Sequence, residues 1–205
     1  MAGCDFDTGI DNKDKQYNEQ SPIFYEPRFF NDEGFTLKIR PISPNDTDAW
    51  IIFVNGLSPN SKYYRFHHII KDVCAKDAQP FCSIDYINSF ALIAELVKDG
   101  LPEIIAVGRY TRINKSTNAE FAIVVDDDFQ RRGIGAEIMK ELAKVASMNK
   151  ITTFEGYTLI ENYEIINFLT KCGFILKIVP RTAMQHVSFP TDRMVGVRGF
   201  EPPTT

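Results

Sequence analysis

Gln130-Arg131-Arg132-Gly133-Ile134-Gly135 is the most informative hexapeptide of this 205-residue chain. It follows the apolar run 120–125 and leads into 134–148, where apolar side chains recur at helical spacing, so we expect a strand, a tight loop and a helix. Glycines let a ligand approach the backbone, and a helix N-terminus offers free N–H groups and the positive end of its dipole. A pyrophosphate fits that environment, with the two arginines adding charge-assisted contacts. A plain strand-to-helix turn with solvated arginines is the alternative.

Working outward, alternating or continuous apolar runs predict the other strands. We expect strands at 35–40, 89–94, 103–110, 120–125, 151–158 and 174–179, with a last one at 183–189. Ser-Pro pairs at 43–44 and 58–59 open helices that run to about 55 and 70, and a loop follows through Pro80. A further helix over 162–172 ends at Gly173.

This order of elements predicts an α/β (α+β) domain. Turn signals at 99–102 and 114–117 join antiparallel strands in the first half, whereas strands and helices alternate in the second half. We therefore expect a mixed, mostly antiparallel central sheet of six to seven strands with helices on both faces.

Composition and charge narrow the class of protein. A hydrophobic content of 44% and a net charge of −4 are ordinary for a soluble globular domain and predict neither a nucleic-acid nor a membrane partner. Four cysteines lack metal-ligand spacing, which argues against a metal site and for reduced thiols in the cytoplasm. The first 15 residues lack the basic start and apolar stretch typical of a signal peptide, and no apolar run approaches about 18 residues, so we expect a soluble, cytoplasmic protein.

The chain divides into three parts. Residues 1–34 hold eight acidic and three basic residues, and we expect an acidic arm whose first 20 residues are disordered and whose aromatic cluster at 23–30 packs on the body. Residues 35–190 form the domain, and 191–205 form a flexible tail.

Two motifs resemble those of the GNAT (GCN5-related) N-acetyltransferases. Residues 130–135 resemble that family's Q/R-x-x-G-x-G/A motif, and Asn162–Phe174 resembles N-x-x-A-x-x-F/L-Y-x-K-x-G-F. Three further segments resemble the Pat-like protein-lysine acetyltransferase subgroup, namely Leu57–Phe66, Ile84–Tyr86 with Ala91–Ala94, and Ala119–Val125. The resemblance covers residues 35–190 in the order of elements.

The resemblance implies the GNAT fold, acetyl-CoA as co-substrate, no metal, and direct attack by an amine on the thioester. The partners would be acetyl-CoA and an amine, with protein lysine favoured over a small molecule, and the protein would be a monomer or homodimer. A backbone N–H on the cofactor strand would stabilise the tetrahedral oxyanion. The residues implied in cofactor binding are Ile123, Val124, Val125, Gln130, Arg131, Arg132, Gly133, Ile134, Gly135, Ala136, Asn162 and Phe168.

The attacking amine must be neutral. For a lysine of pKa about 10.4, deprotonation at pH 7 costs roughly 4.6 kcal/mol, so a nearby base matters. Glu120 matches the strand glutamate that looks catalytic in the Pat-like subgroup; alternatively it pairs with Arg109 across a hairpin. Glu155 is the second candidate base.

The sequence departs from the family pattern at the position of the acid that protonates the departing CoA thiolate. Leu169 stands where many members place a tyrosine acid, which leaves open a catalytically weak acyl-CoA-binding or sensing module. His67 and His68 border the acceptor side in the family, and each is either a substrate contact or a packing or surface residue. Cys172 is expected to be a small buried hydrophobe.

Overall fold

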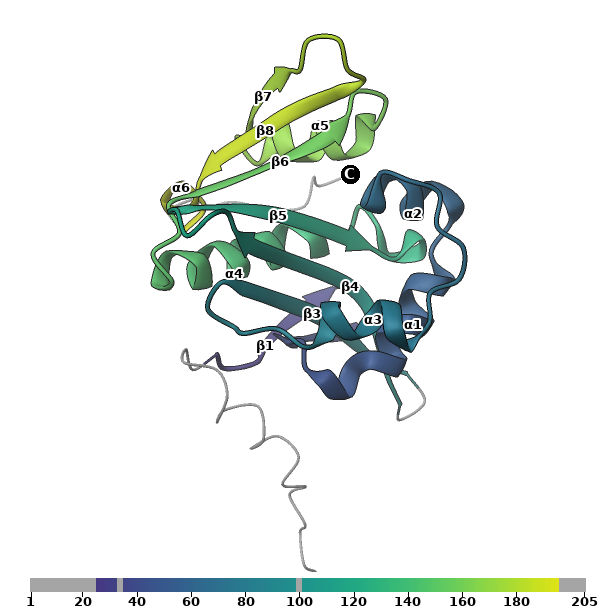
Figure 1. Cartoon of the computed structure of the whole chain (residues 1–205). Coiled ribbons are helices and arrows are strands. Elements are labelled where there is room, and N and C mark those ends of the chain that lie inside the picture. The colour runs from purple at the N-terminus through teal and green to yellow at the C-terminus, as the bar shows by residue number, and fades with distance from the viewer. Residues whose placement is uncertain (1–24, 33–34, 99–100, 196–205) are drawn as a thin grey trace, which may run out of the picture.

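The computed structural model describes residues 25–32, 35–98 and 101–195. They form one sheet with strand order β1-β2-β3-β4-β5-β6-β8-β7, in which only the β5–β6 pair is parallel (Figure 1). The mixed, mostly antiparallel α+β architecture is confirmed, and the described residues hold eight strands rather than six to seven. The strands are β1 (Arg28–Asp32), β2 (Phe35–Pro41), β3 (Ser89–Lys98), β4 (Leu101–Arg112), β5 (Asn118–Val125), β6 (Thr153–Leu159), β7 (Ile175–Ile178) and β8 (Met184–Pro190).

Helices cover both faces of β3, β4 and β5. On β3, Leu92 and Ala94 belong to the apolar cluster under α4 (Ile134–Met148). Ala91 and Ile93 belong to the cluster under α1 (Thr47–Gly56) and α3 (Ala75–Cys82). This alternation follows from the two-residue period of a strand. The helices are η2 (Pro44–Asp46), α1 (Thr47–Gly56), α2 (Pro59–Phe66), α3 (Ala75–Cys82), η3 (Asp127–Phe129), α4 (Ile134–Met148), α5 (Tyr163–Lys171) and α6 (Thr191–Val195).

Two local predictions in the α1–α3 region are wrong. The segment expected to be a loop through Pro80 contains α3, whose start is held by a capping box between Cys74 and Asp77. The helix expected to reach residue 70 ends at Phe66, because His67 takes the left-handed conformation with φ of 57°. A non-glycine residue in that conformation ends a helix.

The two ends of the described chain belong partly to the domain. Strand β1 pairs with β2 ahead of the boundary expected at residue 35, and the expected aromatic packing is seen for Tyr25 and Phe30, which contact the core. The segment expected to be a flexible tail from residue 191 begins with α6, whose Thr191 is buried. The predictions for 1–20 and for 196–205 concern residues outside the described ranges, as does the turn at 99–100.

Candidate active site

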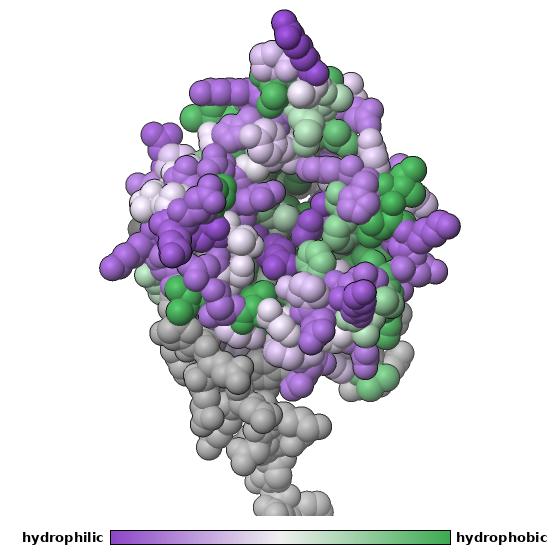
Figure 2. All heavy atoms as spheres, viewed as in Figure 1, coloured by the Kyte–Doolittle hydropathy of each residue, from purple (hydrophilic) through white to green (hydrophobic). Residues whose placement is uncertain are grey.

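Strands β5 and β6 separate after three paired positions. They are in register only at Asn118–Thr153, Ala119–Phe154 and Glu120–Glu155. Beyond that point β6 continues to pair with β8 on its other side, and β5 continues to Val125 beside β4. Figure 1 shows the two strands diverging, and Figure 2 shows a hollow near the middle of the same face. The edge of β5 past Glu120 is therefore open to an extended ligand, which can pair with it as a strand would.

Aromatic packing holds β5 and β6 together where they separate. The ring of Phe121 lies 5.9 Å from that of Phe154 and 5.0 Å from that of Phe174. On β6, a Cβ at Gly156 would lie 3.5 Å from the Phe121 carbonyl oxygen. The strands are thus anchored at the point of divergence.

The loop after β5 has the backbone conformation that the sequence suggested. Arg131 and Gly133 take positive φ angles of 63° and 80°, and Gly133 is the N-cap of α4. Gly133 has no side chain to accept hydrogen bonds from the first N–H groups of α4, which leaves them available to an anion. The Gln130 side-chain amide donates to the Val125 carbonyl at 3.1 Å and so fixes the loop to the end of β5.

Four of the expected cofactor residues lie together. A Cβ at Gly135 would be 3.5 Å from Ile123, 3.6 Å from Val125 and 3.7 Å from Phe168, which come from β5 and α5. The Gly135 backbone therefore lies among apolar side chains beside the open edge of β5.

The other expected cofactor residues differ in how they are placed. Ile134 and Ala136 are buried residues in the first turn of α4, and Val124 packs with the α1–α3 cluster, so these three offer only backbone groups. Arg131 and Arg132 are exposed, with Arg132 stacked on Phe35 and Phe129. Asn162 is buried and caps α5 by accepting from the Ile165 N–H at 3.3 Å.

Glu120 occupies the last pair of the β5–β6 ladder, where the strands begin to separate. Its side chain is exposed and lies on the α1–α3 side of the sheet, beyond Val124 on the same strand. Arg109 and Glu120 form no ion pair in the described part of the chain; Arg109 instead stacks over the Phe81 ring at 4.9 Å. The alternative to a catalytic role, a cross-strand pair of Glu120 with Arg109, is therefore not formed in the structure.

Glu155, the partner of Glu120 in the ladder, is engaged by two neighbours. Its Oε1 accepts from the Asn118 amide at 3.0 Å, and its Oε2 lies 3.2 Å from His186 Nε2. Nothing in the sequence pattern pointed to His186, because β8 becomes a neighbour of β6 only in the folded sheet.

The two histidines after α2 differ in their surroundings. Burial and the positive charge of Arg65 lower the pKa of His67, which favours its neutral form. Both histidines are exposed at the surface, and the His68 Nδ1 lies 2.7 Å from the Phe66 carbonyl oxygen.

Leu169 and Cys172 belong to the core rather than to the site. Leu169 is 1% exposed, and burial raises the pKa of Cys172 to about 12. Burial of Cys172 was expected and is confirmed. Neither side chain offers a proton donor at the opening between β5 and β6.

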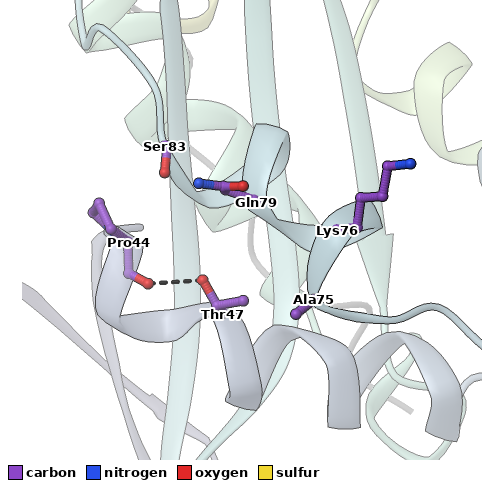
Figure 3. Close-up of a pocket in the computed structure, with 6 residues that line it drawn as sticks. All are labelled: Pro44, Thr47, Ala75, Lys76, Gln79 and Ser83. Atoms are coloured by element: carbon purple, nitrogen blue, oxygen red, sulfur yellow. Dashed lines mark hydrogen bonds between the residues drawn. The ribbon is translucent and has the colours of Figure 1, made fainter.

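A separate surface pocket lies between α1 and α3 (Figure 3). It is lined by Pro44, Thr47, Ala75, Lys76, Gln79 and Ser83. These residues come from elements other than β5, α4 and α5, so the pocket is not part of the site described above.

No group of three or more His, Cys, Asp or Glu side chains among the described residues is placed to hold a metal ion. No helix in that part of the chain is long and apolar enough to cross a bilayer.

Known proteins are similar to this chain in sequence and in fold. Residues 63–174, more than half of the chain, match the acetyltransferase (GNAT) family. Acetyltransferase PA5475 of Pseudomonas aeruginosa is 28% identical over 144 residues, which are 70% of this chain and 77% of that protein. Acetyltransferase Pat of Mycolicibacterium smegmatis is 28% identical over 138 residues, which are 67% of this chain but 40% of Pat.

A solved structure extends the similarity to three dimensions. The GNAT domain of S. lividans PAT is 27% identical, with a TM-score of 0.74 over 82% of this chain and 99% of that domain. This chain belongs to the GNAT family and is an acetyl-CoA-dependent acyltransferase.

Proposed function

We propose that this enzyme acetylates a lysine side chain of a protein, with Glu120 as general base. The observation that carries the proposal is the position of Glu120, exposed at the last β5–β6 pair beside the open edge of β5. An acetyl-thioester laid along that edge would end next to this carboxylate. Similarity to the GNAT domain of S. lividans PAT and to Pat supports a protein acceptor, because three segments of this chain resemble the Pat-like protein-lysine acetyltransferases.

The cofactor would lie between β5 and α4. Its pantetheine arm would pair with the backbone of Ile123–Val125, and its pyrophosphate would accept from the N–H groups of Arg131–Ala136 at the uncapped start of α4. Gln130 fixes this loop to Val125, and Phe168 supplies an apolar wall. Asn162 acts first as the cap of α5, and a contact with the CoA arm would be additional.

The reaction would proceed in a ternary complex. Glu120 takes a proton from the lysine ammonium, directly or through a water, and the neutral nitrogen attacks the thioester carbon. A β5 backbone N–H stabilises the oxyanion of the tetrahedral intermediate, the C–S bond breaks, and CoA leaves as a thiolate that takes up a proton from solvent. An acid is not essential for this last step, because a thiol ionises near pH 8.5.

A catalytically weak acyl-CoA-binding module is the second candidate. It is favoured by Leu169, whose buried side chain replaces the tyrosine expected from the family pattern. Such a module would bind acetyl-CoA without releasing thiol.

One assay separates these functions. Thiol release and mass-shifted product are measured with acetyl-CoA and three acceptor sets: lysine peptides, the same peptides with arginine for lysine, and small amines such as polyamines. Acetylated lysine peptide supports the proposal, whereas acetylation of small amines alone supports a small-molecule acetyltransferase. Binding of acetyl-CoA in calorimetry without thiol release supports the catalytically weak acyl-CoA-binding module. Absence of acetyl-CoA binding would overturn all three.

A further inference from the structure

Two arginines face the acceptor side of the sheet beside Glu120. Arg109 lies on β4, on the same face as Val107, which packs with the α1–α3 cluster. Arg65 lies in the last turn of α2, a helix that packs against β5. Its charge interacts with those of Arg109 and Glu120, which places the three side chains in one region.

Aromatic rings orient both guanidiniums. Arg65 Cζ lies 4.9 Å from the centre of the Phe66 ring, and Arg109 Cζ lies 4.9 Å from the centre of the Phe81 ring. The two rings are themselves in edge-to-face contact, 6.3 Å apart at 88°. Stacking occupies one face of each guanidinium plane and leaves the N–H edges free to bind an anion.

Neither guanidinium is matched by a hydrogen bond or ion pair within the described residues, although both are only partly exposed. Two other partly exposed arginines of this chain do have hydrogen-bond acceptors within the protein. Arg40 donates to Asp46 and to Glu95, and Arg112 donates to the carbonyls of Ser116 and Asn149. Burying guanidinium N–H groups without acceptors is costly, so the Arg65–Arg109 pair is suited to an external anion.

Electrostatics supports the same conclusion. Burial and the nearby positive charge of Arg109 lower the pKa of Arg65 to about 10, so Arg65 remains charged at neutral pH. Burial also lowers the pKa of Arg109, and an arginine guanidinium stays protonated in proteins. The Arg65 charge is opposed by that of Arg109 and favoured by that of Glu120. An incoming carboxylate would relieve this repulsion.

The Arg65–Arg109 pair lies away from the proposed binding site of the cofactor phosphates. The start of α4, where the pyrophosphate is proposed to bind, lies beyond Val125, and Glu120 is five residues earlier on the same strand. Five residues of strand span about 17 Å. The arginine pair is therefore at the acceptor end of the site.

We propose that Arg65 and Arg109 form a carboxylate-binding subsite that selects lysines flanked by Asp or Glu in an acceptor protein. This inference rests on the proposed lysine acetylation and specifies its substrate class. Bidentate hydrogen bonds from a guanidinium to a carboxylate favour a planar anion over a neutral amide of the same shape.

The test compares matched peptides and matched variants. Each peptide carries one acceptor lysine. Either Glu or Gln is placed, one position at a time, at the two positions before the lysine and the two positions after it. The kcat/KM for each peptide is measured with the unmutated enzyme and with the variants Arg65→Gln, Arg109→Gln and Arg109→Lys. Arg181→Gln, an exposed arginine of the β7–β8 turn, is the control. At the best position the unmutated enzyme should prefer Glu over Gln by about tenfold to hundredfold, as for hydrogen bonds to charged groups. Arg109→Gln should reduce this preference to within about twofold, Arg109→Lys should keep part of it, and Arg181→Gln should keep all of it.

Equal rates on Glu and Gln peptides, or a preference that survives in both Arg65→Gln and Arg109→Gln, would overturn the subsite. Acetylation of free lysine or ornithine in preference to every peptide would overturn the protein acceptor.

A binding measurement covers the case in which no amine is acetylated and the proposed function itself fails. Glutarate, compared with glutaramide, should raise the Tm of the unmutated protein and of Arg181→Gln, but not that of Arg109→Gln. If glutarate gives no more stabilisation than glutaramide, the subsite is rejected whatever the activity.

Discussion

Asp127, just after β5, accepts two hydrogen bonds from Ser58 at the start of α2, one from its backbone N–H at 2.9 Å and one from its hydroxyl at 2.8 Å. The Ser61 hydroxyl adds a third at 2.7 Å, and Gln130 lies 3.4 Å from the same hydroxyl. The helix on the acceptor side is thereby tied to the loop that leads to Gly133. This contact gives a physical reason for the spacing of the two serines in the Leu57–Phe66 motif.

The first prediction concerns this tie. Partial burial opposes ionisation of Asp127, but the hydrogen bonds from Ser58 and Ser61 outweigh it, so the pKa of Asp127 lies below its ordinary value of 3.8. A depressed carboxyl pKa contributes stability at pH values above 3.8, and this contribution is lost as the pH falls through the folded-state value. Asp127→Asn should therefore lower the free energy of unfolding by about 1 kcal/mol at pH 7 and raise the KM for acetyl-CoA.

Asp128→Asn is the matched control, because Asp128 is a neighbouring exposed carboxylate. Thermal melts between pH 3 and 8 provide the measurement. The Tm gap between Asp127→Asn and the unmutated protein should close toward the acid end, and a gap that stays constant with pH would contradict the role of the ionised carboxylate.

A second prediction tests how tightly α4 lies on β4. A Cβ at Gly108 would be 2.3 Å from Ile138 Cγ2 and 2.9 Å from Leu142 Cδ1. Gly108→Ala should cost about 1–3 kcal/mol of unfolding free energy, as for other overpacked cores. Gly56→Ala, which meets nothing within 4 Å, should change stability by less. In denaturant melts the double variant Gly108→Ala/Ile138→Ala should be less destabilised than the two single changes summed; full additivity would show that the contact is not the cause.

Gly133 and Gly135 should respond differently to substitution. Gly133 has φ of 80°, so Gly133→Ala should cost about 1–2 kcal/mol through backbone strain even though its Cβ would have room. At Gly135 a Cβ would make ordinary contacts of 3.5–3.7 Å, so Gly135→Ala should leave the Tm almost unchanged. Gly135→Leu should instead weaken acetyl-CoA binding by calorimetry at least tenfold, since its side chain fills the space between β5 and α5. Unchanged affinity in Gly135→Leu would place the cofactor elsewhere.

The sequence predicted the elements with regular periodicity and missed those that depend on local caps or on contacts across the fold. The α4 helix was predictable because Ile138, Leu142 and Val145 repeat on one face. Helix α3 was missed because Pro80 lies inside it and its capping residue is a cysteine. The separation of β5 from β6 leaves no local signature, since Phe121 meets Phe154 and Phe174 only after folding.

The candidate site was predictable in part. The glycine loop and Glu120 were visible as motifs, and the structure places them at the two ends of the open β5 edge. The partners of those motifs, such as Asp127 for Ser58 and His186 for Glu155, are far apart in sequence and follow no periodic pattern. Their positions are set by the order of the strands in the sheet and by the paths of the loops, and neither can be deduced from the periodicity of a single sequence.

The last prediction separates the two glutamates that face each other in the β5–β6 ladder. Glu120 is exposed and forms no ion pair with Arg109, whereas Glu155 is held by Asn118 and His186. If Glu120 is the base, Glu120→Gln should lower kcat at pH 7 by about 10²–10⁴-fold, the usual contribution of general-base catalysis, with little change in acetyl-CoA affinity. Glu155→Gln keeps an oxygen and an amide for the same neighbours and should reduce kcat by less than tenfold. Raising the pH from 6 to 9 should partly restore Glu120→Gln, because more of the acceptor amine is then neutral without a base. A Glu120→Gln enzyme with unchanged turnover across that range, together with a large loss in Glu155→Gln, would transfer the role of base to Glu155.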